Sequence, residues 1–346
     1  MKTILIHAVD GNAFDPDARD RVSDPGIFLR EKLLSLGYRL DLSADYGLDD
    51  CVWVFFYDAT SVLRYHGLHG IARWMRDCLI KRRLLRDLYT ECQRAGLEQR
   101  IALFLWEPPS TTFANYDARL HNLFPTIFTW NDDLVDGRKF HKVCIPQPRQ
   151  FPELPAISFS QKKLLVNISA NKYSRHPREL YSARRATIRH FERVRPDDFD
   201  LYGVGWNRPA TLVERRLPFV WHRYPSYRGT VRHKWDVLPR YRFSVCYENI
   251  RDEPGYVTEK IFDSLRADCV PIYWGASNIT DYVNEGAFID RRQFGSNLEL
   301  ERFIIGITET EYKRFQANIQ AYLASERFAQ FLPPAFAETI IRVLHL

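Results

Sequence analysis

Short apolar runs alternate with helix-like segments twice along this 346-residue chain, and a proline-rich stretch separates the two halves. Apolar runs of this length are typical of buried parallel strands, and apolar residues at helical spacing between them indicate helices packed on a sheet. The pattern predicts an α/β fold with doubly wound sheets. The predicted strands are 3–9, 38–42, 51–58 and 100–106 in the first half, and 163–170, 198–206, 241–249 and 269–275 in the second.

The stretch IPQPRQFPELPAIS (145–158) carries four prolines and no hydrophobic period, so we predict a linker there. The domains expected from it are residues 1–150 and 151–320, followed by a helical tail over 321–346. Two α/β domains joined in this way would leave a cleft between them, a usual place for a ligand. The predicted helices are 26–38, 71–97, 179–194, 256–266 and those of the carboxyl-terminal segment 298–346.

Composition narrows the class of protein further. The chain is 45% hydrophobic and 27% charged, with a net charge of +6 that is compatible with a phosphorylated small molecule, a nucleic acid or a membrane surface. From net charge alone, a mildly basic soluble protein with no polyanionic partner fits equally well. Its six cysteines form no C-x-x-C pair, which disfavours a zinc site or a disulfide framework. No apolar run approaches the roughly 18–20 residues of a membrane span, and the amino terminus does not resemble a signal peptide. We expect a cytoplasmic protein and leave peripheral membrane association open.

Polar residues gather at the start of the predicted helix 256–266, in the stretch PGYVTEKIFDSLRADCVPIYWG (254–275). A helix amino terminus presents unpaired N–H groups that suit a phosphate, and Lys260 adds a formal charge. Lysine is unfavourable at this end of a helix unless an anion compensates it. Glu259 either caps the helix or accepts hydrogen bonds from sugar hydroxyls. A capped surface helix remains the alternative.

Three further segments place charged side chains next to predicted strands. The cations of VRHK (231–234) precede the strand that ends in Glu248 and Asn249, an arginine-rich helix carries Arg185, and Glu107 directly follows the strand 100–106. Ligands of open α/β sheets lie at the carboxyl ends of strands, and a carboxylate held rigidly before two prolines suits a general base. A solvated loop, surface arginines and a simple turn are the competing interpretations.

Together these segments resemble the donor-binding signature of the α-1,3/1,4-fucosyltransferases, glycosyltransferase family 10. The string YRFSVCYEN-IRDEPG-YVTEKIFDSLRADCVPIYWG resembles the family's YKF-x4-EN, YVTEK and VP-[IV]-x-x-G pattern, and VRHKWDVLPRY, FDLYGVGW and RATIRHF resemble the segments that precede it. LWEPPSTTF resembles the family's E-x-P segment. The resemblance covers residues 164–282 closely and residues 101–135 moderately.

The resemblance implies a GT-B fold, in which two Rossmann-like domains face each other across a cleft. It also implies inverting transfer of L-fucose from GDP-β-L-fucose to a hydroxyl of an oligosaccharide or glycolipid acceptor, commonly GlcNAc, in α-1,3 or α-1,4 linkage. The chain resembles a bacterial, cytosolic member that would build a surface glycan such as lipopolysaccharide. GDP-fucose would be a co-substrate, no cofactor is expected, and no metal is expected because no D-x-D motif stands out.

The same resemblance implies roles for individual residues. Glu107 would be the general base, while Arg185 and Lys260 would neutralise the departing diphosphate. Glu259 would be catalytic and, with Tyr256, would hold the ribose or the fucose. The full set of expected donor-binding residues is Arg185, Val231, Arg232, His233, Lys234, Glu248, Asn249, Tyr256, Val257, Thr258, Glu259 and Lys260.

Two alternatives remain at this point. The same fold could use a different GDP-linked deoxy sugar, because such a change needs only a small change in the pocket. More remotely, the chain could be a basic nucleic-acid-binding protein, since cations and aromatic residues interleave over 215–242 as base-stacking surfaces require.

Overall fold

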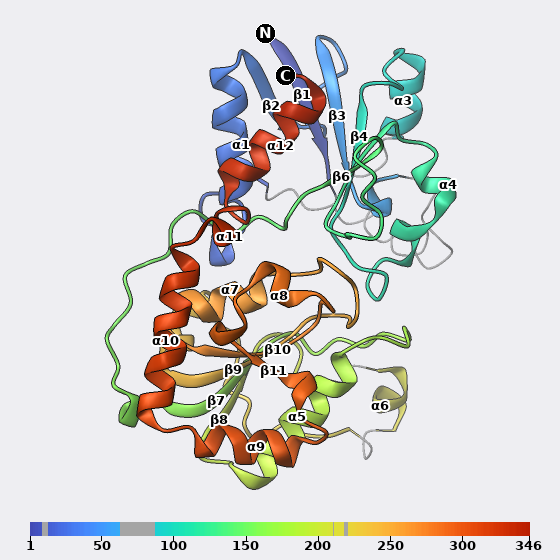
Figure 1. Cartoon of the computed structure of the whole chain (residues 1–346). Helices are drawn as coiled ribbons and strands as arrows, with labels where there is room; N and C mark the ends of the chain where they lie inside the picture. The colour runs from blue at the N-terminus through green and yellow to red at the C-terminus, as the bar shows by residue number, and fades with distance from the viewer. Residues whose placement is uncertain (9–12, 63–86, 210, 218–220) are drawn as a thin grey trace. The chain divides into compact units, whose positions relative to one another are not determined.

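The computed structural model describes residues 1–8, 13–62, 87–209, 211–217 and 221–346. The chain forms two compact units (Figure 1). Unit 1 contains Met1–Arg149 and Phe331–Leu346, and unit 2 contains Gln150–Gln330. The predicted helix over 71–97 falls largely outside the described residues, and its described end forms the short helix α3 (Leu88–Arg94).

Unit 1 is built on a six-stranded sheet in the order β2-β1-β3-β4-β5-β6, and its described strand pairs are all parallel. All five residues of β4 are buried, as expected for a central strand with side chains packed on both faces. The four strands predicted for the first half are confirmed. The strands are β1 (Lys2–His7), β2 (Tyr38–Leu42), β3 (Cys51–Tyr57), β4 (Ile101–Leu105), β5 (Thr126–Thr129) and β6 (Phe140–Lys142).

The carboxyl-terminal helix α12 (Pro333–Leu344) packs in unit 1 beside α1 (Asp24–Ser35). Its apolar face shares one core cluster with Leu29 and Leu33 of α1. Residues 321–346 were expected to form one separate tail, but burial of this face makes 331–346 part of unit 1. The shorter helices of unit 1 are η1 (Arg19–Arg21), η2 (Ala59–Ser61), η4 (Phe113–Tyr116) and α4 (Ala118–His121).

Unit 2 is built on a second parallel sheet with the order β11-β10-β9-β7-β8. The four strands predicted for the second half are confirmed, as is the helical character of 298–346. The strands are β7 (Lys163–Ile168), β8 (Phe199–Tyr202), β9 (Tyr241–Tyr247), β10 (Val270–Trp274) and β11 (Ile289–Asp290). The helices are η5 (Phe159–Gln161), α5 (Tyr181–Val194), α6 (Leu212–Arg216), η7 (Lys234–Asp236), η8 (Leu238–Arg240), α7 (Glu259–Arg266), α8 (Ile279–Tyr282), η9 (Glu285–Ala287), η10 (Arg291–Gln293), α9 (Asn297–Gly306), α10 (Glu309–Leu323) and α11 (Glu326–Ala329).

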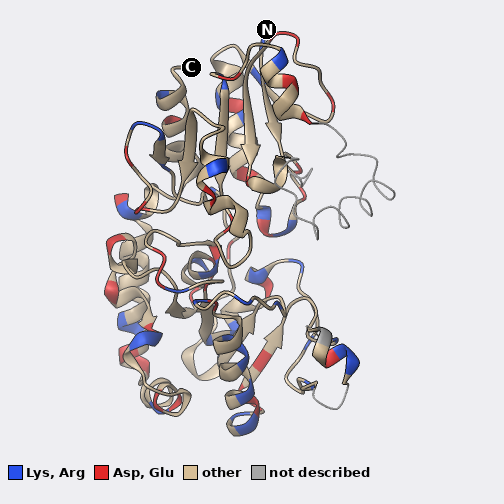
Figure 2. Ribbon diagram, turned by 90° about the vertical axis from the view of Figure 1, so that its right-hand side faces the viewer, with Lys and Arg blue, Asp and Glu red and all other residues tan. Residues whose placement is uncertain are grey.

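The two sheets share one topology, which fixes where a ligand is expected. In each sheet the first strand lies between the second and the third, so β1 neighbours β3 and β7 neighbours β9. Connections leave in opposite directions at these positions, and ligands of doubly wound folds lie at the carboxyl ends of such strands. Charged residues of both signs lie mainly on helices and loops, while the strands are mostly uncharged (Figure 2). The predicted α/β class is confirmed.

Candidate functional site

The polar stretch after β9 in unit 2 is held in place by a turn and then by helix α7. Gly255 adopts a φ of +80°, and the extended Thr258 caps the helix by accepting a hydrogen bond from the Lys260 backbone N–H at 3.4 Å. The helix therefore begins at Glu259 instead of the predicted Tyr256. Tyr256 and Val257 precede the helix and are 3% and 0% exposed.

Glu248, immediately after β9, is fully buried and holds the start of α7. Its carboxylate accepts hydrogen bonds from the Thr258 backbone N–H at 2.9 Å and from the Thr258 hydroxyl at 2.8 Å. Lys260 Nζ lies 3.1 Å from Glu248 Oε2. A buried carboxylate thus supplies an anion for Lys260, where the sequence pattern suggested that a ligand would supply it. Burial raises the pKa of Glu248, and Lys260 opposes that rise.

Glu259 and Lys260 are adjacent in sequence, and their charged groups lie 3.7 Å apart. Burial disfavours the charge on Lys260, but Glu248 and Glu259 outweigh that effect and raise its pKa. Burial would raise the pKa of Glu259, but Lys260 and Lys234 lower it instead. The lowered pKa favours the ionised carboxylate, and the Glu259 side chain remains 41% exposed and so accessible to a hydroxyl-bearing ligand.

Lys234, in η7, is a second lysine next to the start of α7. Its Nζ contacts Asp263 Oδ2 at 2.6 Å and Glu259 Oε1 at 3.7 Å. Of the other predicted residues in this segment, His233 stacks on Trp235 at 4.3 Å, Val231 packs against a core cluster, and Arg232 is exposed. Lys234 therefore joins the charged cluster around α7.

Arg184, which directly precedes the predicted Arg185, lies on the buried side of α5. Its guanidinium donates hydrogen bonds to the backbone carbonyls of Tyr247 and Glu248, and the residue is 3% exposed. Arg185 instead donates to the Lys172 carbonyl at 2.7 Å. The helical repeat explains the difference, because Arg184 is seven residues from the buried Phe191 and so lies on the same face.

A small cavity connects these residues at the carboxyl ends of β7 and β9. Three cations line it, Arg184, Lys234 and Lys260, together with Ser169 after β7 and Asp263 of α7. Arg185 is not among its lining residues. Asn249, after Glu248, approaches the Tyr256 hydroxyl at 3.5 Å. The cavity therefore places positive charge at the position where the topology of unit 2 predicts a ligand.

Gly275, after β10, allows Glu248 to reach this position. A Cβ atom at residue 275 would lie 2.4 Å from Glu248 Cγ and 2.5 Å from the Tyr273 hydroxyl oxygen. We expect Gly275→Ala to lower the free energy of unfolding by about 1–3 kcal/mol, measured by urea denaturation, because the buried carboxylate must move. Gly306→Ala is the control, because a Cβ there meets no atom within 4 Å. Equal stability of both variants would contradict the close packing around Glu248.

Glu107 lies in unit 1, two residues after the last residue of β4. Its side chain is half-buried, and within the part of the chain that the structure describes its carboxylate has no hydrogen-bond or ion-pair partner. The carboxylate is therefore available to accept a proton. The residues around it include Asp58, which directly follows β3 and was predicted only as the last residue of the strand 51–58.

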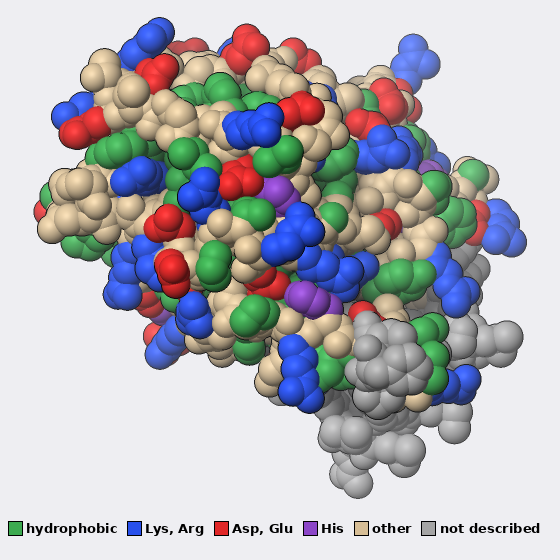
Figure 3. Space-filling model, turned by 90° about the horizontal axis from the view of Figure 1, so that it is seen from below, with side chains coloured by type: hydrophobic (Ala, Val, Ile, Leu, Met, Phe, Trp, Pro, Cys, Tyr) green, Lys and Arg blue, Asp and Glu red, His purple; other side chains and the backbone are tan. Residues whose placement is uncertain are grey.

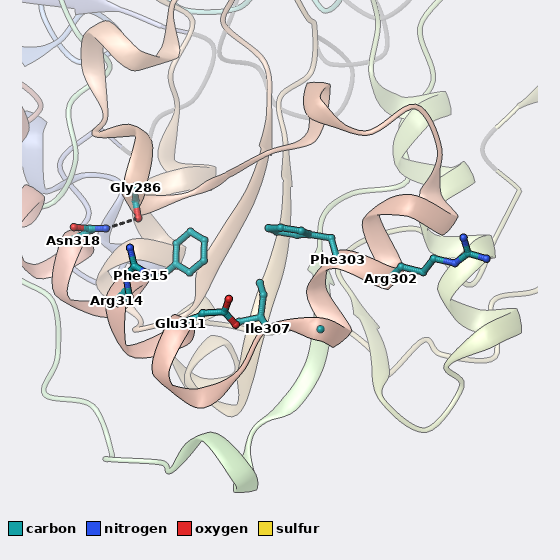
Figure 4. A pocket seen from close by; sticks show the side chains of 9 residues that line it. Gly286, Arg302, Phe303, Ile307, Glu311, Arg314, Phe315 and Asn318 are labelled. Carbon is teal, nitrogen blue, oxygen red and sulfur yellow. Dashed lines mark hydrogen bonds between the residues drawn. The ribbon is translucent and has the colours of Figure 1, made fainter.

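A second hollow of about 520 Å³ lies between α9 and α10 (Figure 4). Phe303 and Phe315 face it from the two helices, with Arg314 and Glu311 near Phe315, whereas the Arg302 side chain points away from Phe303. None of the predicted site residues lines it. The hollow lies away from the strand ends that the topology of unit 2 marks for ligands.

Among the described residues we looked for a metal site, a membrane-spanning helix and a nucleic-acid-binding surface. Among these residues, no cluster of three or more histidine, cysteine or acidic side chains could hold a metal ion, and the metal-free prediction stays untested. No described helix is both long and apolar enough to cross a bilayer. On the face drawn in Figure 3, basic, acidic and apolar side chains are interspersed, whereas nucleic-acid-binding proteins typically gather their cations.

A family model covers most of unit 2. Residues 183–330 match the carboxyl-terminal domain of glycosyltransferase family 10, the fucosyltransferases. The similarity to glycosyltransferase family 10 is thus shown for this region of unit 2. The match contains every predicted donor-binding residue, whereas Glu107 lies outside it.

Curated proteins similar to parts of this chain are named as fucosyltransferases. It is 38% identical over 87 residues to an alpha-(1,4)-fucosyltransferase of Arabidopsis thaliana, covering 25% of this chain and 21% of that protein. It is 38% identical over 64 residues to an alpha-(1,3)-fucosyltransferase of Helicobacter pylori, covering 18% of this chain and 13% of that protein. The matched stretches thus span about a fifth or less of these relatives.

Solved structures agree over the whole chain at low sequence identity. An alpha1,3-fucosyltransferase with GDP superposes with a TM-score of 0.52 at 14% identity, covering 100% of this chain and 90% of that one. HepE of Anabaena, in complex with UDP and glucose, gives a TM-score of 0.55 at 13% identity, covering 100% of both chains. These similarities confirm the predicted GT-B fold.

Proposed function

We propose that this protein transfers L-fucose from GDP-β-L-fucose to a hydroxyl of an oligosaccharide or glycolipid acceptor, with inversion at the anomeric carbon. The observation that carries the proposal is the cluster of Arg184, Lys234 and Lys260 at the ends of β7 and β9, inside the family-10 domain. The names of the curated fucosyltransferases support the choice of sugar. A GlcNAc acceptor in α-1,3 or α-1,4 linkage, within surface-glycan synthesis, is the reaction we expect.

The charges of unit 2 suit the departure of a nucleoside diphosphate. Negative charge develops on the leaving diphosphate, and cations already in place stabilise that transition state without reorganising. Lys260 is 20% exposed and Lys234 15% exposed, so both are shielded from bulk water and still able to meet phosphate oxygens. Glu248 orients Lys260 and remains fully buried, so we assign it a positioning role.

Two carboxylates complete the proposed reaction. Glu259 is ionised and part-exposed beside the two lysines, which suits hydrogen bonds to the hydroxyls of the ribose or the fucose and stabilisation of an oxocarbenium-like state. Glu107 would take the proton from the acceptor hydroxyl as that oxygen attacks the anomeric carbon. The C–O bond to GDP breaks on the face opposite the attack, and the diphosphate leaves with the bonding electron pair.

Calorimetry with GDP, GDP-fucose and UDP tests the donor. We expect GDP and GDP-fucose to bind with micromolar dissociation constants, a binding free energy of about −8 kcal/mol, and UDP to bind more weakly. The protein should then transfer fucose from GDP-fucose to members of a panel of lacto- and neolacto-type oligosaccharides. The assay is run with and without EDTA, which removes metal ions. Failure to bind GDP would refute the proposed donor. Transfer from another GDP-linked deoxy sugar, with none from GDP-fucose, would favour the alternative donor.

A further inference from the structure

The backbone of Trp106 and Glu107, just after β4, is fixed by hydrogen bonds with several side chains. The Trp106 and Glu107 backbone N–H groups both donate to Asp58 Oδ1, at 2.7 Å and 3.2 Å. The Trp106 carbonyl accepts a hydrogen bond from Trp130 Nε1 at 3.0 Å, and the Glu107 carbonyl accepts one from Asn115 Nδ2 at 2.9 Å. All four backbone polar groups of these two residues therefore have a partner, although the Glu107 carboxylate itself stays available.

Asp58 and Asn115 join three separate segments of unit 1. Asn115 is 0% exposed, and its side-chain amide donates to Asp58 Oδ1 at 2.7 Å while its carbonyl oxygen accepts from the Ala59 backbone N–H at 2.7 Å. One oxygen of Asp58 thus receives three N–H groups. The pair connects the loop after β3, the loop after β4 and the helix η4.

The conformation of Asp58 has a cost that these contacts offset. Its φ is +59° with a ψ of 165°, a region that non-glycine residues occupy at roughly 1–3 kcal/mol. The residue is 9% exposed, and burial raises the pKa of Asp58 to about 7, while the N–H groups of Trp106 and Glu107 act to lower it. A strained, buried acid of this kind persists only where the surrounding contacts require it.

We propose that Asp58, together with Asn115, is a positioning residue that holds Glu107 in the geometry needed for proton abstraction. The inference rests on the proposed function, because it assigns Glu107 as the base. A general base must lie within hydrogen-bond reach of the proton that it takes, and a displacement of about 1 Å can cost a factor on the order of 10² in rate. Asp58 and Asn115 fix the backbone of Glu107 through hydrogen bonds, so only rotations of its side chain can change the position of the carboxylate.

The test compares Asp58→Ala and Asp58→Asn in the full-length protein with GDP-fucose and an acceptor from the panel. Asp58→Ala removes the oxygen that receives three N–H groups, and we expect kcat to fall by about 10–100-fold with little change in the KM for GDP-fucose. Asp58→Asn keeps an acceptor oxygen in the same place and should recover most of the rate. Asn115→Ala, which frees the Glu107 carbonyl, should lower kcat in the same direction.

The control is Asp136→Ala. Asp136 also accepts three backbone N–H groups, those of Arg138, Lys139 and Phe140, at 2.8–2.9 Å. It precedes β6 and therefore lies at the amino-terminal edge of the parallel sheet, away from Glu107. This variant should keep the wild-type kcat, even if its thermal stability falls.

The deciding measurement repeats Asp58→Ala in the Glu107→Gln background. If Asp58 acts through Glu107, the second substitution lowers kcat by no more than about twofold further. An equal loss in both backgrounds, or an unchanged kcat in Asp58→Ala alone, overturns the proposal.

Hydrogen exchange of the Trp106 and Glu107 amides gives a readout besides activity, because Asp58→Ala should make this exchange faster. Absence of transfer by the wild-type protein would refute the proposed function instead, and unchanged amide exchange would refute the role of Asp58.

Discussion

Replacing Glu107 with glutamine is expected to lower kcat for fucose transfer by about 10²–10⁴-fold, because the amide cannot accept the proton of the acceptor hydroxyl. The substitution preserves the size of the side chain and both hydrogen bonds of the residue's backbone. GDP affinity should stay within about twofold of wild type, since the cations proposed to bind the diphosphate belong to unit 2. Steady-state kinetics and calorimetry on the same preparations measure the two effects.

Glu98→Gln is the matched control for this experiment. Glu98 is an exposed carboxylate in the same unit, and it precedes β4 at the opposite edge of the sheet from Glu107. It should show wild-type kinetics. A Glu107→Gln protein with full turnover would show that another group accepts the proton, and a loss of GDP affinity equal to the loss of rate would point to misfolding.

Replacing Lys260 with alanine should have two separate effects. Loss of a charge-assisted contact to phosphate should weaken GDP binding by roughly 10–100-fold, equivalent to about 1.5–3 kcal/mol. Glu248 would also lose its partner while 0% exposed, and an unpaired buried charge typically costs about 3–5 kcal/mol of stability. The stability of this variant should rise as the pH falls. Burial already raises the pKa of Glu248 in the folded state, so as the pH falls Glu248 takes up a proton in the folded protein before it does so in the unfolded chain, and the unpaired charge is removed.

The double variant Lys260→Ala with Glu248→Gln separates the two effects. It should regain much of the lost stability, because no charge remains unpaired, while GDP binding stays weak. Lys313→Ala is the control, since that lysine is 67% exposed and pairs with Glu309 on the surface of α10. GDP binding by Lys260→Ala at the wild-type affinity would exclude Lys260 from the diphosphate site.

Several local features were predictable because they depend on neighbouring residues in the chain. The strands β4 and β10 follow from compact apolar runs, and the end of β4 placed Glu107 at a strand end before two prolines. The start of α7 was placed three residues early, because the signals for a turn at Gly255 and for a cap at Thr258 overlap. The capping hydrogen bond of Thr258, visible only in the fold, decides between them.

Features that depend on contacts between distant segments could not be predicted from the sequence. The resemblance to the family pointed to Arg185 on α5. Only the packing of α5 against the end of β9 shows that Arg184 reaches the carbonyls of Tyr247 and Glu248. Likewise, Asp58 and Asn115 are 57 residues apart, so their contact could not be inferred from spacing.

The sequence by itself therefore determined the α/β class, the family resemblance and the positions of Glu107, Glu259 and Lys260 relative to their strands and helices. These properties follow from short-range periodicity and from ordered motifs. Tertiary structure alone decided that Glu248 is the counter-ion of Lys260, that α12 belongs with unit 1 and that Asp58 holds the peptide of Glu107. Each of these is an interaction between residues far apart in the chain, where hydrogen bonds and burial form only after the sheets have assembled.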